Sequence, residues 1–257
     1  MHITRALPGL ALAVLTAVSA TACVSSSTST STSGGSATSG AHEVAADIDL
    51  LTVDDFATLT QRAPDLAGTV ALSITTTALG DPVTMDAEVR TRRDGDPDLR
   101  VYLAVDGYDP LDLRMVDSTL YVSDGSRTEG GFVAVDPTDV TSSYVTTYQQ
   151  LADQTDTFLH LTMLDAGVLA VDAVGAPVTM DGVEVQQYDV VLDGAALAAA
   201  EGSILPAEVT FTYWIDADHL WHRVTADVDG VTVTSTAHGW GEPVEIEAPA
   251  PEELIEG

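Results

Sequence analysis

The sequence predicts an α+β fold, with one large antiparallel sheet of about ten strands and a few helices inserted into the strand order. Most of the chain after residue 68 alternates apolar and polar residues with a period of two, which is typical of half-buried strands. Short turn sequences such as Gly80–Pro82 and Asp106–Gly107 separate neighbouring runs, and such turns join antiparallel neighbours. A few other stretches have apolar residues at helical spacing instead.

The first part of the folded region is expected to be a short helix followed by a meander of strands. The helix lies within residues 51–64, where Thr52 or Asp54 can act as the N-cap. Its helical spacing is set by Val53, Phe56, Leu59 and Thr60. In each strand that follows, alternate residues share a face. The apolar faces are Val70, Leu72 and Ile74; Val83, Met85, Ala87 and Val89; Leu99, Val101, Leu103 and Val105; and Leu111, Leu113 and Met115. A turn is expected at Asp117–Ser118.

The central segment, residues 138–168, predicts one or two helices that interrupt the sheet. Its apolar residues at helical spacing are Tyr144, Tyr148, Leu151, Phe158, Leu161, Met163 and Leu164. Strand patterns resume within residues 168–180, 183–193, 208–216, 220–230 and 231–240, with a short alanine-rich helix at 195–201. Because each strand has one apolar face, the sheet must cover that side by curling, by stacking or with the inserted helices.

The N-terminal residues have the layout of an export signal. Arg5 precedes an apolar run over residues 6–18, and small residues precede Cys23, the only cysteine. The run is shorter than the roughly 20 residues that span a bilayer. The stretch from Ala20 to Cys23 resembles the lipobox of bacterial lipoproteins, which implies that Cys23 carries the lipid anchor. The alternative is an ordinary secreted protein with a free thiol.

The chain is therefore expected to have three parts. Residues 1–22 form a lipoprotein signal peptide, and residues 23–43 form the lipidated cysteine with a flexible tether rich in serine, threonine and glycine. Residues 44–257 form a single domain. This organisation predicts an exported protein that is anchored by lipid to the outer face of the cytoplasmic membrane.

The charge balance excludes several classes of partner. The chain has 40 acidic residues against nine basic ones, and every basic residue is arginine. Such a chain repels phosphate backbones and anionic membrane surfaces, so no nucleic-acid partner is expected and membrane residence must come from the lipid anchor. The acidic excess is interpreted as a solubility feature, with recognition of a cationic partner as the alternative.

No catalytic or metal-binding motif stands out in the sequence. It contains no Gly-x-Ser-x-Gly elbow and no phosphate-binding glycine loop, so we expect neither an enzyme nor a cofactor. His219 and His222 are three residues apart and would point to opposite faces of a strand, which disfavours a metal site. The stretch Asp94–Asp98 starts like a calcium loop but lacks the required glycine and glutamate, so an acidic turn is the better interpretation.

Several blocks of the sequence resemble one family of bacterial lipoproteins. Residues 214–216 (Trp-Ile-Asp) and 240–249 (from Trp-Gly-Glu-Pro-Val to Pro) are similar to the C-terminal signature of the actinobacterial LppX/LprAFG lipoproteins. Residues 115–122, 130–137 and 181–193 are similar to the remaining blocks, in the same order. The resemblance implies a LolA/LolB-like fold, in which a curved sheet forms a half-barrel around the helices and encloses an apolar cavity.

The resemblance also implies that the cavity binds or shuttles acyl lipids or glycolipids. The residues expected to line it are mostly aliphatic, which suits acyl chains, although the same residues could fill an ordinary closed core. They are Val70, Leu72, Ile74, Val83, Met85, Leu99, Val101, Leu103, Leu161, Met163, Leu164, Val209, Phe211 and Tyr213.

Two functions from different classes therefore compete. The first is a membrane-anchored lipid carrier, whose partners would be an acyl lipid or glycolipid, the membrane through its anchor, and an envelope transporter. The second is an anchored, non-catalytic interaction or sensory module with a closed core and no lipid ligand. Binding of acyl chains in a cavity would distinguish the first function from the second.

Overall fold

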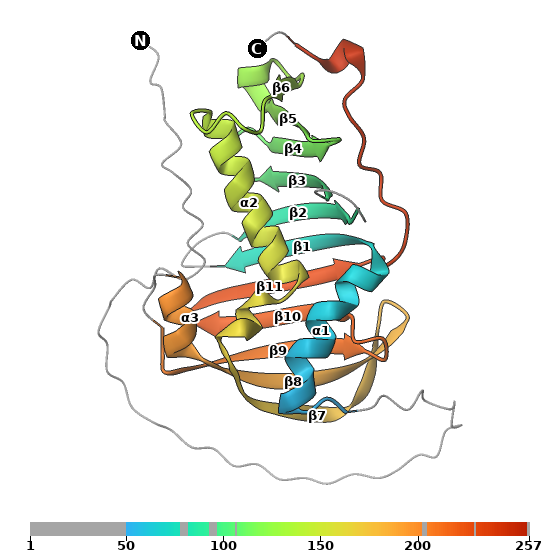
Figure 1. Ribbon diagram of the computed structural model, residues 1–257, viewed down its shortest axis with the longest axis vertical. Coiled ribbons are helices and arrows are strands. Elements are labelled where there is room, and N and C mark those ends of the chain that lie inside the picture. The colour runs from blue at the N-terminus through green and yellow to red at the C-terminus, as the bar shows by residue number, and fades with distance from the viewer. Residues whose placement is uncertain are drawn as a thin grey trace.

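The described part of the chain folds around a single sheet. The computed structural model describes residues 50–77, 82–92, 97–105, 107–201, 205–228 and 230–255. These residues form an eleven-stranded antiparallel sheet with three α-helices, which confirms the expected α+β class. The sheet is open, with the strand order β6-β5-β4-β3-β2-β1-β11-β10-β9-β8-β7 (Figure 1). In chain order, β1 to β6 therefore run from the middle of the sheet to one edge, and β7 to β11 run from the other edge back to the middle. Strands β1 and β11 pair there.

The strand bounds follow the alternation in the sequence. The N-terminal half of the sheet consists of β1 (Thr69–Thr77), β2 (Val83–Arg90), β3 (Asp98–Ala104), β4 (Leu111–Val116), β5 (Thr119–Asp124) and β6 (Val133–Val135). The C-terminal half consists of β7 (Val168–Met180), β8 (Val183–Asp193), β9 (Glu208–Asp216), β10 (Trp221–Val228) and β11 (Val231–His238). The expected turn at Asp117–Ser118 is confirmed. Both of its residues have positive φ, which matches the twist of a two-residue hairpin.

The three α-helices lie on the same face of the sheet (Figure 1). They are α1 (Val53–Ala67), α2 (Ser143–Leu159) and α3 (Gly194–Glu201), and the 3-10 turn η2 (Thr162–Ala166) follows α2. Helix α1 crosses the C-terminal half, and α2 runs obliquely over the N-terminal half. Helix α1 ends at Gly68, whose positive φ of 81° allows its amide to bond back to Pro64. The expected helices are thereby confirmed.

Helix α1 turns three of its four expected residues toward the core, since Phe56 and Thr60 are buried and Leu59 is partly buried against it. Phe56, Thr60, Ala63 and Pro64 are its buried residues, whereas Val53 is 41% exposed. The hydroxyl of Thr60 donates a hydrogen bond of 2.7 Å to the carbonyl of Phe56, so this polar residue is buried without an unpaired donor. The helix therefore turns an aromatic and small-residue stripe toward the sheet.

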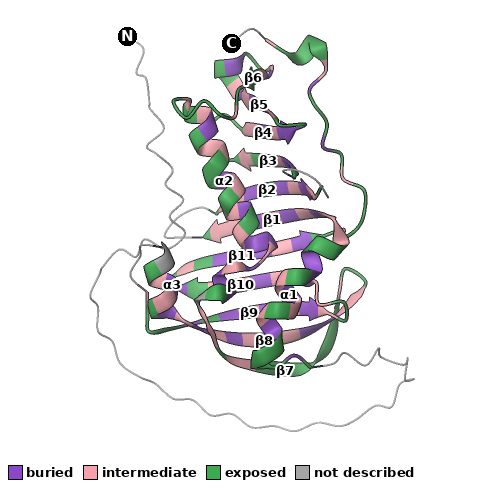
Figure 2. Cartoon of the chain, in the orientation of Figure 1, coloured by how far each residue is buried: buried purple, intermediate pink, exposed green. Residues whose placement is uncertain are grey.

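The core lies between the sheet and the helices, where the buried residues gather (Figure 2). Its two halves differ in composition. In the C-terminal half, Phe56 packs edge-on against Tyr188 and Tyr213, with ring centroids 5.8 and 5.3 Å apart. Trp221 is fully buried and packs edge-on against Trp240. The expectation of a mostly aliphatic inner surface holds by number in this half, although Tyr188, Phe211, Tyr213 and Trp221 are buried among the aliphatic residues of β7 to β11. It also holds for β2 to β5, whose buried apolar residues in the described chain are all aliphatic or methionine.

A C-terminal strap, residues 243–255, runs past the ends of the strands in the N-terminal half (Figure 1). Its end pairs with the segment before β6: the Phe132 amide donates to the Glu253 carbonyl at 2.8 Å, and the Ile255 amide donates to the Phe132 carbonyl at 2.9 Å. Within the strap, Ile246 is almost completely buried. The strap is thus fixed to the N-terminal half by its own backbone.

Candidate functional site

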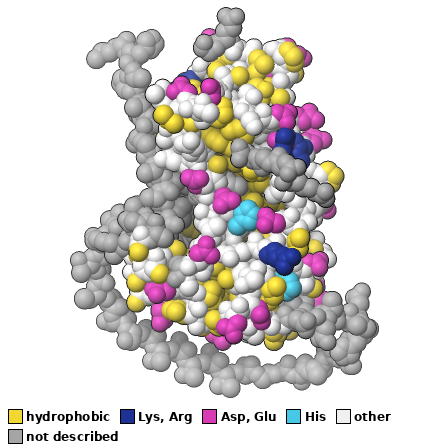
Figure 3. Space-filling model, viewed as in Figure 1, with side chains coloured by type: hydrophobic (Ala, Val, Ile, Leu, Met, Phe, Trp, Pro, Cys, Tyr) yellow, Lys and Arg dark blue, Asp and Glu magenta, His cyan; other side chains and the backbone are white. Residues whose placement is uncertain are grey.

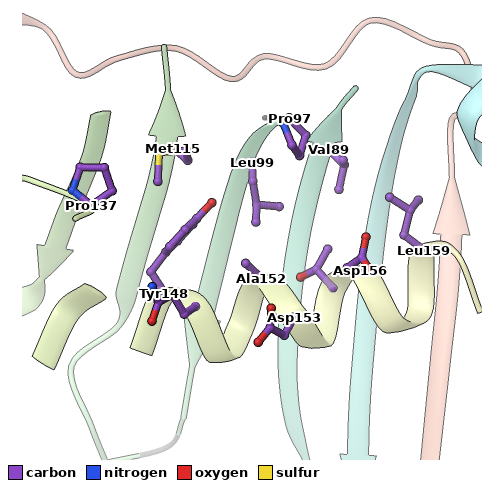
Figure 4. A pocket seen from close by; sticks show the side chains of 12 residues that line it. Val89, Pro97, Leu99, Met115, Pro137, Tyr148, Ala152, Asp153, Asp156 and Leu159 are labelled. Carbon is purple, nitrogen blue, oxygen red and sulfur yellow. The ribbon is translucent and has the colours of Figure 1, made fainter. Parts of the chain in front are cut away.

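An apolar groove of about 370 Å³ lies between α2 and the strands β2, β3 and β4. On the sheet side it is lined by Val89, Leu99 and Met115, one residue from each strand. Figure 4 shows Tyr148 and Ala152 of α2 on the opposite side of this space. Pro97, Pro137, Gln149, Asp153, Thr155, Asp156 and Leu159 complete the lining.

The groove exists because α2 is attached to the sheet at its two ends. Near its N-terminus, the Tyr144 hydroxyl donates a hydrogen bond of 3.3 Å to the carboxylate of Asp124, at the end of β5. Asp124 is itself nearly buried and pairs with Arg127 at 3.1 Å. Val145, one position further along, is almost completely buried. These contacts hold the first turn of α2 against the edge region of the sheet.

The C-terminal end of α2 is attached to the opposite half of the sheet. Trp221 of β10 donates its indole N–H to the carbonyl of Leu159 at 3.2 Å, and Phe158 and Leu159 are buried. Leu161 follows with a positive φ of 50° and is fully buried, so the chain reverses sharply into η2. Between the two attachments, the small side chain of Ala152 faces the strands and leaves the groove unfilled.

The chemistry of the groove is apolar inside and acidic at its border. The floor residues Val89, Leu99 and Met115 are buried, and the hydroxyl of Thr155 is bonded within the helix to the carbonyl of Leu151. Asp153 and Asp156 of α2 provide the carboxylates. Figure 3 shows apolar side chains exposed along the middle of this face, bordered by acidic ones. Such a site can desolvate a hydrocarbon chain while a polar group remains in water.

The residues expected to line a cavity divide unevenly between groove and core. Leu99 lines the groove. All the others except Val83 pack in the core, where Leu103 is only partly buried, and Val83 is a half-exposed residue outside that core. The core residues of this set are Val70, Leu72, Ile74, Met85, Val101, Leu103, Leu161, Met163, Leu164, Val209, Phe211 and Tyr213. These residues belong to the packed core between the sheet and α1, α2 and η2. The groove lies beside this packed region.

Sequence reasoning missed most of the groove lining. Val89 and Met115 were assigned to inward strand faces, and Tyr148 to a helix, but the pattern does not say which inward residues lack a partner across the core. Ala152 gives no apolar signal of its own. The alternation identifies a face, whereas a gap depends on how closely a helix from elsewhere in the chain approaches that face.

A network of charges covers the outer face of the sheet behind the groove. The buried carboxylate of Asp98 accepts hydrogen bonds from Arg90 and Arg92, both at 2.7 Å, and Arg92 also pairs with Asp117. Burial alone would raise the pKa of Asp98, but the hydrogen bonds from Arg92 and Arg90 outweigh it and hold that pKa below its ordinary value.

Two further arginines of the outer face, Arg100 and Arg114, share the carboxylate of Asp112 at 3.1 and 2.9 Å. The guanidinium of Arg114 also lies 4.4 Å from the ring centroid of Phe132. Arg90 and Arg114 donate further hydrogen bonds to the strap carbonyls of Ile246 and Glu247. The network therefore connects β2, β3 and β4 with the C-terminal strap.

The other groups considered in the sequence have structural contacts. Asp216 accepts the backbone amides of Asp218 and Leu220 and pairs with His222 at 2.8 Å, while His219 occupies the turn between β9 and β10. In the described part of the chain, no three His, Cys, Asp or Glu side chains form a metal-binding group. Asp98 begins β3 and is ion-paired, whereas Asp94 and Asp96 of the expected acidic turn lie outside the described residues.

The expected membrane anchor also falls outside the described residues, because Cys23, the signal segment and the tether precede residue 50. Among the helices that the structure describes, none has the length and apolar character to cross a bilayer.

The fold and the groove together define a class of protein. An open antiparallel sheet with helices on one face is the LolA-like form of the α+β class. Two solved structures share it. LprF from Mycobacterium bovis is 17% identical, with a TM-score of 0.50, and the match covers 77% of this chain and 99% of LprF. The lipoprotein LppX from Mycobacterium tuberculosis is 16% identical, with a TM-score of 0.50, and the match covers 76% of this chain and all of LppX.

These likenesses confirm the expected LppX/LprAFG resemblance at the level of the fold. The sequence itself matches no protein-family model, and no curated protein is significantly similar to it.

Proposed function

We propose that this protein is a lipoprotein of the bacterial envelope that binds an acyl lipid in the groove between α2 and the sheet. The observation that carries the proposal is the groove itself, an apolar space of about 370 Å³ that the core residues leave unfilled. The shared fold with LprF and with the lipoprotein LppX supports it. Binding and release of a hydrocarbon chain would be the function, with no covalent chemistry.

The size of the groove sets a limit on what it can hold. A methylene group occupies roughly the volume of a water molecule, about 30 Å³, so the groove takes on the order of a dozen methylenes. Each buried methylene is worth about 0.8 kcal/mol. Because association costs at least several kcal/mol in lost freedom, a chain of this length gives moderate net affinity. This affinity suits a carrier that must release its ligand.

The N-terminal sequence supports the cellular setting of this proposal. Cys23 would be lipidated after removal of residues 1–22, and residues 23–43 would tether the domain to the outer face of the cytoplasmic membrane. The domain would then meet envelope lipids, and an envelope transporter could deliver or remove them.

Native mass spectrometry tests the proposal directly. The chain from Val44 to Gly257 contains every strand of the sheet and the whole groove. It is to be purified from a bacterial host, measured, and then organically extracted. We expect a stoichiometric adduct with the mass of an acyl lipid. An unliganded mass that persists after incubation with an envelope lipid extract would contradict the proposal and favour the interaction module.

A pair of variants shows whether the adduct occupies the groove. Ala152→Phe fills the space that this small residue leaves, so the adduct should disappear while the fold remains. Gln150→Phe is the matched control, because Gln150 is an exposed residue of the same helix and does not line the groove. If both variants retain the adduct, the lipid binds elsewhere.

A further inference from the structure

The border of the groove carries carboxylates from two helices. Asp153 and Asp156 of α2 line the groove, and Asp65 of α1 joins them through His160. His160 contacts Asp156 at 2.9 Å through Nδ1 and Asp65 at 3.2 Å through Nε2. The Asp153 side chain has no hydrogen-bond or ion-pair partner among the residues that the structure describes. His160 thus pairs with two carboxylates, and the third, Asp153, lies one turn before Asp156 on α2.

Arg62, one turn before Asp65 on α1, offsets at most one of these three carboxylates, and the two described arginines that adjoin the groove floor in sequence offset none. Arg90 follows the groove residue Val89, and Arg92 is two positions further along. Both are engaged by Asp98 on the outer face of the sheet, and Arg92 also pairs with Asp117. These four side chains sum to zero net charge. The formal charge of the whole chain is −31, so the long-range field has the same sign as the groove border.

From this charge distribution we propose that the groove selects a single-chain amphiphile whose headgroup carries no negative charge. The inference rests on the proposed function, since it concerns the ligand of the same groove. The groove volume admits about one chain of a dozen methylenes, and two chains of that length would need roughly twice the space. An anionic headgroup at the mouth would lie beside Asp153 and Asp156, whereas a cationic or sugar headgroup would not be repelled.

Three amphiphiles with the same twelve-carbon chain test the inference: dodecyltrimethylammonium, dodecyl glucoside and dodecanoate. Their affinities for the chain from Val44 to Gly257 are to be measured by calorimetry at pH 8, below the concentrations at which they form micelles. In 10 mM salt we expect dodecanoate to bind about 3- to 10-fold more weakly than the glucoside, as for exposed charge pairs. In 500 mM salt the difference should shrink to less than about 2-fold, because salt screens exposed charges.

The double variant Asp153→Asn, Asp156→Asn should abolish most of this discrimination, so that dodecanoate and dodecyl glucoside bind it with similar affinities. The matched control is Asp172→Asn, Glu208→Gln, which removes the same number of charges from exposed positions on β7 and β9. The control should discriminate as the parent chain does. If the control and the groove variant behave alike, the selection comes from net charge and not from the groove border, which overturns the inference.

The outcomes also separate this inference from the proposed function. If dodecanoate binds as tightly as the other two at low salt, the groove binds chains but does not select headgroups, and only the inference fails. If none of the three binds, the groove holds no alkyl chain, and the inference fails together with the proposed function.

Discussion

The two halves of the sheet show how one fold can hold a closed core and an open groove side by side. In the C-terminal half, Phe56 of α1 packs edge-on against Tyr188 and Tyr213. Trp221 donates a hydrogen bond to the C-terminal end of α2. In the N-terminal half, β2 to β5 present buried aliphatic and methionine side chains, and α2 covers them without filling the space. Large rigid rings on the strands close one half, whereas the described strands of the other half contribute no buried ring.

The halves also differ in what stabilises them. The stability of the C-terminal half depends on apolar packing between the inner face of the sheet and α1. The N-terminal half has less of that packing and carries the arginine and aspartate network on its outer face, together with the C-terminal strap. The comparison teaches that strands lining an open groove can be supported by polar contacts on the opposite face of the sheet.

Phe56→Ala should have the largest effect, because it removes the central ring of the closed half. A fully buried phenylalanine costs about 3–5 kcal/mol of unfolding free energy when truncated. Urea unfolding followed by circular dichroism measures the loss. Leu99→Ala, which borders an existing space in the other half, should cost clearly less. Equal losses would show that the groove half is packed as tightly as the closed half.

Asp98→Asn should have the next largest effect, because it removes the buried charge that pairs with two arginines. The expected loss is about 1–3 kcal/mol at pH 7. The folded state holds the pKa of Asp98 below the value near 3.9 of an unfolded aspartate, so this carboxylate contributes stability above that value. The contribution is lost as the pH falls through the lower, folded pKa. The difference in stability between the variant and the parent chain should therefore begin to narrow once the pH falls below about 3.9.

A series of urea unfolding curves from pH 7 to pH 2 measures this dependence. Ser73→Ala, on the outer face of β1 and outside the network, serves as the control. A gap between the Asp98→Asn variant and the parent that stays constant over the whole pH range would mean that the carboxylate is not the stabilising group.

Gly131→Ala should loosen the strap by a smaller amount, about 1 kcal/mol. A Cβ atom at this position would lie 2.8 Å from the carbonyl oxygen of Glu253 and 2.9 Å from the Ile255 side chain, so the strap must move. Hydrogen exchange should accelerate at the amides of Phe132 and Ile255, while the core strand residues Leu120 and Val122 stay protected. Uniform acceleration would show that the strap and the sheet unfold together.

Tyr213→Phe should have the smallest effect, and in the opposite direction. The Tyr213 hydroxyl is buried in the closed half without a hydrogen-bond partner in the described structure. Burial raises the pKa of this phenol, so it stays protonated and keeps its desolvation cost. Removing the hydroxyl should leave the protein equally stable or stabilise it by up to about 1 kcal/mol, as measured by thermal unfolding. A clear loss of stability would mean that the hydroxyl has a bonding partner.

Local patterns in the sequence were sufficient to predict most elements of the fold. Alternation identified the inward faces of β1 to β4 and the strands β7 to β11, because the period of a strand is a property of the backbone. Turn chemistry identified Asp117–Ser118, and helical spacing identified α1 and α2. The helix face of α1 was predicted in part: Phe56 and Thr60 are buried as expected, whereas Val53 is exposed.

The sequence by itself determined the sheet, its apolar face and the acidic charge of the chain, because these follow from residue types and short-range periodicity. Only the tertiary structure decided where the core is closed and where it is open. Trp221 and Asp124 lie far from α2 in sequence, yet they fix its two ends. The distance between a helix and a sheet depends on such long-range contacts. Leu99 and Leu72 are both inward-facing leucines, yet Leu99 lines the groove opposite Ala152 whereas Leu72 packs in the core.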